Sequence, residues 1–221
     1  IYHYGNWIWL RYLTEKFPKR AGGLPVIVRT MWRKAGDKMY SIQAIASTLK
    51  AEKTSFAKEY AMFAAKNRYA RKFYAEGKAE SYPQAPVVDS IALPKSSYTN
   101  WVSANLYHQS SAAWRATPKN VSGTWKLLVS IKGPDASHDP MAVVDQVTKK
   151  GKHVFKLVHL NKKGDGTLKV PFANSKTAEV TVTLVNAGTS YKQCGGNSVF
   201  ACGGVSKDDG KYSMKFQVVK H

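Results

Sequence analysis

The chain has 221 residues, enough for one large domain or two small ones, and 43% of them are hydrophobic, so it can bury a core. No run of about 18 apolar residues occurs, so we expect no segment that spans a bilayer. Thirty-four Lys and Arg against 14 Asp and Glu give a formal charge of +20, which favours polyanionic partners. Because residue 1 is Ile rather than Met, we expect a processed product or a piece of a longer chain.

The positive charge is spread along the sequence. Residues 1–90 carry a net +9 and residues 91–221 a net +11. Nucleic-acid-binding proteins usually gather their charge on one stripe or motif. The even spread therefore favours an anionic cell-envelope or matrix polymer over nucleic acid as the partner, although both hypotheses stay open.

Residues 1–76 are predicted to form a helical segment of about four helices, because apolar residues recur three or four positions apart. Pro18 is expected to end the first helix, and Pro25 to start the second in its first turn. Ser41 and Ser55 precede the last two apolar stripes, where each side chain can cap a helix.

Residues 77–97 contain three prolines among polar residues and are predicted to be a connector. Beyond it the apolar period changes to two, most clearly in residues 125–131. About seven or eight short segments of this kind, separated by Gly, Asn or Asp, predict a β-sandwich domain over residues 98–221. The expected fold class is α+β, with an antiparallel, jelly-roll-like sandwich after the helices.

The only two cysteines, Cys194 and Cys202, lie in one Gly-rich stretch. Two thiolates without a nearby His cannot supply the four ligands of a structural zinc site, and they are not a Cys-x-x-Cys pair. A local disulfide is therefore predicted, which would place the chain in an oxidising compartment. Two buried free thiols are the alternative.

Six Trp and twelve Tyr supply many aromatic side chains. Three tryptophans on predicted apolar faces are expected in the core: Trp7, Trp32 and Trp125. Three other aromatic residues form the candidate contact surface, for sugar rings, nucleobases or a second copy of the chain: Trp101, Tyr107 and Trp114.

Other combinations of polar residues predict no active site or cofactor. Asp135, His138 and Asp139 lie near serines, but in a Gly- and Pro-rich loop without a nucleophile-elbow pattern. Residues 161–166 hold one carboxylate, which favours a hairpin turn over a calcium loop. No Gly-rich phosphate loop of a recognised type occurs, so no cofactor is expected.

Several short motifs resemble, in the same order, a family of secreted bacterial proteins classed as metalloproteases, first named from myxobacteria and common in actinobacteria. The most extensive match is residues 4–17 (YGNWIWLRYLTEKF). The other matching segments are residues 27–32 (IVRTMW), 41–49, 55–56, 63–68 (FAAKNR), 82–83, 184–187 (LVNA) and 202–204 (CGG). The resemblance covers nearly the whole chain and implies a helical part followed by a sandwich.

In that family the metal site is implied by a His-Glu-x-x-His helix upstream of the residues that match here. Such a motif needs two His one helical turn apart to hold zinc, and no pair among the six His of this chain is spaced by four. No catalytic residue and no metal ligand of the family can therefore be assigned here. Zinc is expected only in a longer precursor.

Together these observations predict a secreted, non-catalytic binding or assembly module from a metalloprotease-like precursor, located at the cell surface or in the extracellular matrix. One alternative is a fragment of an active zinc metallopeptidase whose catalytic residues lie upstream. Another is a cationic protein that binds nucleic acid or an anionic envelope. Self-association stays an open alternative, because exposed aromatic residues and sheet edges serve subunit contacts and ligand sites alike.

Overall fold

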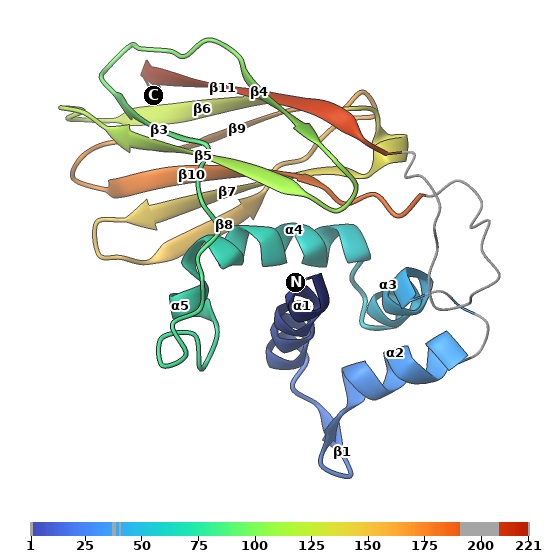
Figure 1. Ribbon diagram of the computed structural model, residues 1–221. Helices are drawn as coiled ribbons and strands as arrows, with labels where there is room; N and C mark the ends of the chain where they lie inside the picture. The colour runs from blue at the N-terminus through green and yellow to red at the C-terminus, as the bar shows by residue number, and fades with distance from the viewer. Residues whose placement is uncertain (1, 37–38, 40, 191–207, 221) are drawn as a thin grey trace. The chain divides into compact units, whose positions relative to one another are not determined.

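A computed structural model describes residues 2–36, 39, 41–190 and 208–220 (Figure 1). These residues divide into a helical unit that ends at Ala85 and a β unit that begins at Pro86. Each unit has its own hydrophobic core. The α+β class is therefore confirmed, and the units are described one at a time.

The helical unit contains four main helices, as predicted, and a short fifth. Their bounds are α1 (Tyr2–Lys16), α2 (Val26–Gly36), α3 (Ser41–Ala51), α4 (Phe56–Lys66) and α5 (Ala70–Phe73). A two-residue hairpin joins the first two helices, formed by β1 (Arg20–Ala21) and β2 (Leu24–Pro25), and a 3-10 turn, η1 (Asn67–Tyr69), follows α4. Consecutive main helices pack against one another.

Of the predicted helix ends, those at Ser55 and Pro18 agree with the local structure. The Ser55 hydroxyl accepts a hydrogen bond from the Lys58 backbone N–H (3.2 Å), so Ser55 caps α4. Pro18 lies two residues beyond α1. Pro25 differs from the prediction because it ends β2, directly before the first residue of α2.

Aromatic side chains dominate the core of the helical unit. Trp9 lies 5.1 Å from Phe63 and 5.9 Å from Phe56 between ring centroids, both in edge-on contacts. Trp7 is not in this core but half exposed against Tyr82, which corrects the prediction for Trp7. The buried set is Trp9, Tyr12, Leu13, Ile27, Met31, Leu49, Phe56, Phe63, Ala70, Tyr74 and Tyr82.

The β unit is built from two sheets. The five-stranded sheet has the order β3-β5-β10-β7-β8, and the four-stranded sheet the order β4-β11-β6-β9. The strands of the first are β3 (Asp89–Leu93), β5 (Ser111–Pro118), β7 (Pro140–Thr148), β8 (His153–Leu157) and β10 (Thr177–Asn186). The strands of the second are β4 (Val102–Leu106), β6 (Trp125–Lys132), β9 (Asp165–Pro171) and β11 (Gly210–Lys220).

The sandwich differs from the sequence-based prediction at one edge. Strand β3 lies inside residues 77–97, the stretch expected to be a connector, and it pairs with β5 in parallel. The other neighbouring strands are antiparallel. The unit is therefore a mixed rather than a purely antiparallel sandwich, and jelly-roll connectivity stays a prediction.

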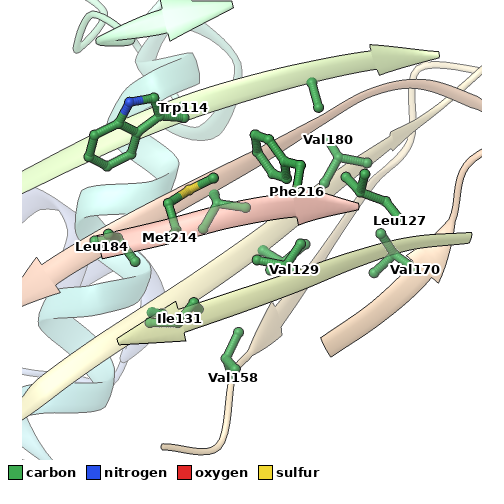
Figure 2. Close-up of a cluster of buried hydrophobic side chains, with 14 of the residues drawn as sticks. Trp114, Leu127, Val129, Ile131, Val158, Val170, Val180, Leu184, Met214 and Phe216 are labelled. Atoms are coloured by element: carbon green, nitrogen blue, oxygen red, sulfur yellow. The ribbon is translucent and has the colours of Figure 1, made fainter. Parts of the chain in front are cut away.

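The core of the β unit lies between the two sheets (Figure 2). Val180, Leu184 and Trp114 come from the five-stranded sheet and face Leu127, Val129 and Phe216 of the four-stranded sheet. Every second residue of β6 and β11 is buried, as the period of two predicted. The intervening residues of these strands lie on the opposite, outer face of their sheet.

Candidate functional site

The strand register gathers lysines on the outer face of the four-stranded sheet. Residues directly opposite in a ladder share a face, so the pairing of Lys215 with Ser130 and of Lys132 with Ser213 places both lysines there. We call this surface the lysine face. Its registered cations are Lys126, Lys132, Lys169, Lys211 and Lys215, and its one registered carboxylate is Asp165.

An exposed tryptophan lies beside two of these lysines. Trp101 immediately precedes β4 and is 41% exposed. The Lys132 Nζ lies 4.8 Å and the Lys215 Nζ 5.2 Å from its ring centroid. Both distances are in the cation–π range, so the indole holds two ammonium groups beside an accessible aromatic surface.

The segment before β4 adds a second exposed ring to the lysine face. Tyr98 forms an antiparallel bridge with Gln217, an outward-facing residue of β11, and is 72% exposed. Backbone hydrogen bonds from Thr99 N to Phe216 O (2.9 Å) and from Val218 N to Ser97 O (2.8 Å) fix this segment along β11. The face therefore combines two aromatic rings with ammonium groups on a regular sheet.

The three residues predicted as a contact surface lie in different environments. Trp101 belongs to the lysine face, and Tyr107, just after β4, is 70% exposed. Trp114 is only 2% exposed and packs in the sandwich core, so its inclusion was wrong. The sequence did not distinguish these three residues. The pattern of residues 111–117 does not show which face of β5 is buried, and Trp114 lies on that face.

The sequence alone does not predict the lysine face. Its cations come from three strands, β6, β9 and β11, that are far apart in the sequence. The alternation of Lys126, Leu128, Ser130 and Lys132 with apolar residues was the available signal. Pairing between strands, which a single sequence does not give, was needed to bring the other lysines beside them.

Two His–Asp pairs of the β unit could not be predicted from the sequence either. His108 Nδ1 lies 2.7 Å from the buried Asp208 carboxylate, and His153 Nδ1 lies 2.7 Å from Asp145 Oδ2. His108 follows β4 and Asp208 precedes β11, so the first pair joins the ends of two strands that build the lysine face. Burial, together with the nearby Asp208 carboxylate, raises the pKa of Asp139 at this end of the sandwich.

The Asp135, His138 and Asp139 group, for which no active site was predicted, lies in a capped turn. Asp135 accepts hydrogen bonds from the Ser137 backbone N–H (2.9 Å) and the Ser137 hydroxyl, which lower the pKa of Asp135. A Ser-His-Asp relay needs the hydroxyl on one imidazole nitrogen and the carboxylate on the other. Here the nearest groups, Ser137 Oγ (3.2 Å) and Asp135 Oδ1 (3.4 Å), both lie at His138 Nδ1, which is not that arrangement.

Residues 161–166 form a turn, as predicted, but not a hairpin turn, because the strands on either side, β8 and β9, belong to different sheets. Asn161 Oδ1 accepts hydrogen bonds from the backbone N–H groups of Lys163 (2.8 Å) and Asp165 (3.1 Å). This turn leads from the five-stranded sheet into β9 of the four-stranded sheet, so it joins the two layers.

Cys194 and Cys202 lie outside the described residues, and their disulfide stays a prediction. Among the residues that the structure describes, no group of three or more His, Cys, Asp or Glu is arranged to hold a metal ion. Within the same ranges, no helix has the length and apolar character needed to cross a bilayer.

No protein-family profile and no curated protein matches the chain. Solved structures with some similarity include the pre-peptidase C-terminal domain of collagenase from Bacillus anthracis, with 8% identity over 61% of this chain and 98% of that one, at a TM-score of 0.33. PliG of Salmonella Typhimurium, a periplasmic inhibitor of g-type lysozyme, has 9% identity over 59% of this chain and 99% of its own, at a TM-score of 0.30. A family 16 carbohydrate-binding module has 10% identity over 52% and 74% of the two chains, at a TM-score of 0.31. All three TM-scores are low, and nothing about the function of this chain rests on them.

Proposed function

We propose that this chain is a binding module that holds an anionic polysaccharide of the cell surface or extracellular matrix on its lysine face. The observation that carries the proposal is that the Lys132 and Lys215 ammonium groups both lie within cation–π distance of the exposed Trp101 ring. A ring that is exposed and flanked by cations suits a ligand that is itself a ring bearing negative charge. Uronic-acid and sulfated sugars have both properties.

The composition of the lysine face favours a polysaccharide over nucleic acid. Its registered cations are all Lys, whereas specific contacts with bases and phosphates most often use the planar, bidentate Arg guanidinium. Lysine acts as a hydrated point charge, which suits repeated carboxylates or sulfates along an extended polymer. Single-stranded nucleic acid can also stack on exposed aromatic rings, so it is the competing ligand in the test.

The cellular setting of the module rests on the sequence resemblance alone. We place it in a secreted, metalloprotease-like precursor, where a polysaccharide-binding segment would keep the protein at its site of action. The precursor, secretion and the disulfide are parts of this proposal.

The experiment measures the affinity of the full chain at low salt for four probes: polygalacturonate, dextran sulfate, neutral dextran and an oligothymidylate. We expect binding to the two acidic polysaccharides and none to neutral dextran. Replacing Trp101→Ala, or Lys132→Gln together with Lys215→Gln, is expected to weaken binding roughly tenfold.

A matched control removes the same charge elsewhere on the β unit. Lys149 and Lys176 are exposed, and a backbone hydrogen bond of 3.1 Å joins them. The double variant Lys149→Gln and Lys176→Gln should bind almost as the unaltered chain does. Equal losses of affinity in the two double variants would show that only net charge matters for binding. Tighter binding of the oligothymidylate than of either acidic polysaccharide would show that the ligand is nucleic acid.

A further inference from the structure

The hairpin and second helix of the helical unit form a strongly basic stretch. Between Lys16 and Gly36 the sequence has five further cations and no Asp or Glu. Four of the five are exposed: Lys19, Arg20, Arg29 and Arg33. Lys34 is half-buried and donates a hydrogen bond to Ser47 Oγ (2.8 Å).

Helix α2 has one buried and one exposed face. Ile27 and Met31, four residues apart, belong to the core of the helical unit. Arg29, Trp32 and Arg33 are exposed on the other side of the helix, where Arg29 lies three residues before Trp32 and four before Arg33. Trp32 was expected in the core, but it is 73% exposed, the highest value among the large hydrophobic residues described as exposed.

The hairpin is held next to this exposed face. Arg29 Nη1 donates a hydrogen bond to the Ala21 carbonyl (3.4 Å), and Arg20 Nη1 donates one to the Gly23 carbonyl (2.9 Å). Gly22 and Gly23 have φ values of 58° and 77°, which allow the tight turn at the tip. Leu24, directly after this turn, is a second exposed apolar side chain.

We propose that this hairpin–helix surface, made of Leu24, Arg29, Trp32 and Arg33 with Lys19 and Arg20, binds peripherally to an anionic lipid membrane. Arginine and lysine side chains are attracted to anionic headgroups, and no carboxylate in the stretch opposes them. Tryptophan is favourable at the level of the headgroups, and leucine gains from burial in the acyl boundary. A hydrated polysaccharide offers these two apolar side chains no comparable gain, so we assign the surface to lipid.

The residues of this surface belong to the helical unit, and those of the lysine face belong to the β unit. The two proposals can therefore succeed or fail independently. A chain with both surfaces would attach to a membrane and to an acidic polymer.

The test is co-sedimentation of the full chain with vesicles at low salt. One vesicle type contains equal amounts of phosphatidylglycerol and phosphatidylcholine, and the other contains phosphatidylcholine alone. We expect binding to the anionic vesicles only. Trp32→Ala is expected to lower the partition coefficient about tenfold, and Arg29→Gln with Arg33→Gln about fivefold for each charge removed.

Two control variants separate this proposal from simple charge attraction and from the lysine face. Lys50→Gln with Lys58→Gln removes two cations of the helical unit outside the hairpin and α2, and should lower binding much less than the arginine pair. The lysine-face variant Lys132→Gln with Lys215→Gln should retain most vesicle binding. Circular dichroism checks that each variant is folded.

The proposal is overturned by any of three results: no sedimentation of the unaltered chain with anionic vesicles, undiminished binding of Trp32→Ala, or equal losses in the arginine and control pairs. Loss of vesicle binding in the lysine-face variant alone would also overturn it, because the membrane would then contact the β unit.

Discussion

At the residue scale, the helical unit stabilises a buried carboxylate with three different donors. Glu59 of α4 accepts hydrogen bonds from the Tyr12 hydroxyl (2.7 Å), the Thr54 hydroxyl (2.7 Å) and the Lys16 ammonium group (2.7 Å). Burial raises the pKa of Glu59, but hydrogen bonds from Lys16, Tyr12 and Thr54 outweigh it and hold the pKa below its usual value. The network links α1 to the start of α4.

Glu59→Gln is expected to lower the free energy of unfolding of the helical unit by about 2 kcal/mol at neutral pH. Because the folded-state pKa is lowered, the stabilisation by the carboxylate is present above its unfolded-state pKa and is lost as the pH falls through the folded value. The difference in free energy of unfolding between the unaltered chain and Glu59→Gln should therefore become smaller at acidic pH. Urea unfolding followed by helical circular dichroism, at neutral and acidic pH, measures it; an equal difference at both pH values would contradict this account.

Two tryptophans of the β unit have opposite roles. Trp114→Ala removes a buried side chain of the sandwich core and is expected to cost about 3–5 kcal/mol of stability. Trp101→Ala removes an exposed side chain and should change stability by less than about 1 kcal/mol. Thermal unfolding of the two variants measures the contrast, and similar losses of stability would show that Trp101 is a core residue.

At the scale of elements, a buried amide joins strand ends on both sheets. Asn186, the last residue of β10, donates from Nδ2 to the carbonyls of Asp208 (2.7 Å) and Leu106 (3.3 Å). Its Oδ1 accepts from the Gly188 backbone N–H (3.0 Å). The ends of β4 and β11 are thereby tied to the five-stranded sheet.

Asn186→Ala leaves these buried backbone groups without their side-chain partner and is expected to destabilise the β unit by about 2–4 kcal/mol. Amide hydrogen exchange should also rise first at the Leu106 end of β4 and the Gly210 end of β11. A uniform rise in exchange over the sandwich would show instead that Asn186 stabilises the whole core and not these two strand ends in particular.

The spacing of apolar residues and the capping residues predicted most of the helices and strands, but not which strands pair with one another. The alternation in β6 and β11 and the cap at Ser55 were readable because each depends on residues close in sequence. Strand β3 was missed because its neighbour β5 lies about 20 residues further on and prolines flank it. Of the three residues predicted as a contact surface, Trp101 and Tyr107 are exposed and Trp114 is buried, and the lysine face depends on register between distant strands.

At the scale of the whole molecule, the even charge along the sequence conceals local concentration on the surface. The four-stranded sheet collects five lysines on one face, and the hairpin with α2 collects cations without a carboxylate. High charge on both surfaces implies that any association of the intact chain with polyanions weakens as salt rises. A polymer held only by net charge would respond equally to the loss of any lysine.

The most direct test of the lysine face is therefore the salt dependence of the affinity for polygalacturonate. The logarithm of the association constant, plotted against the logarithm of salt concentration, should fall less steeply for Lys132→Gln with Lys215→Gln than for the unaltered chain, because fewer counterions are released. The control pair Lys149→Gln with Lys176→Gln should keep the slope of the unaltered chain. Parallel lines for all three proteins would contradict the assignment of the lysine face as the binding site.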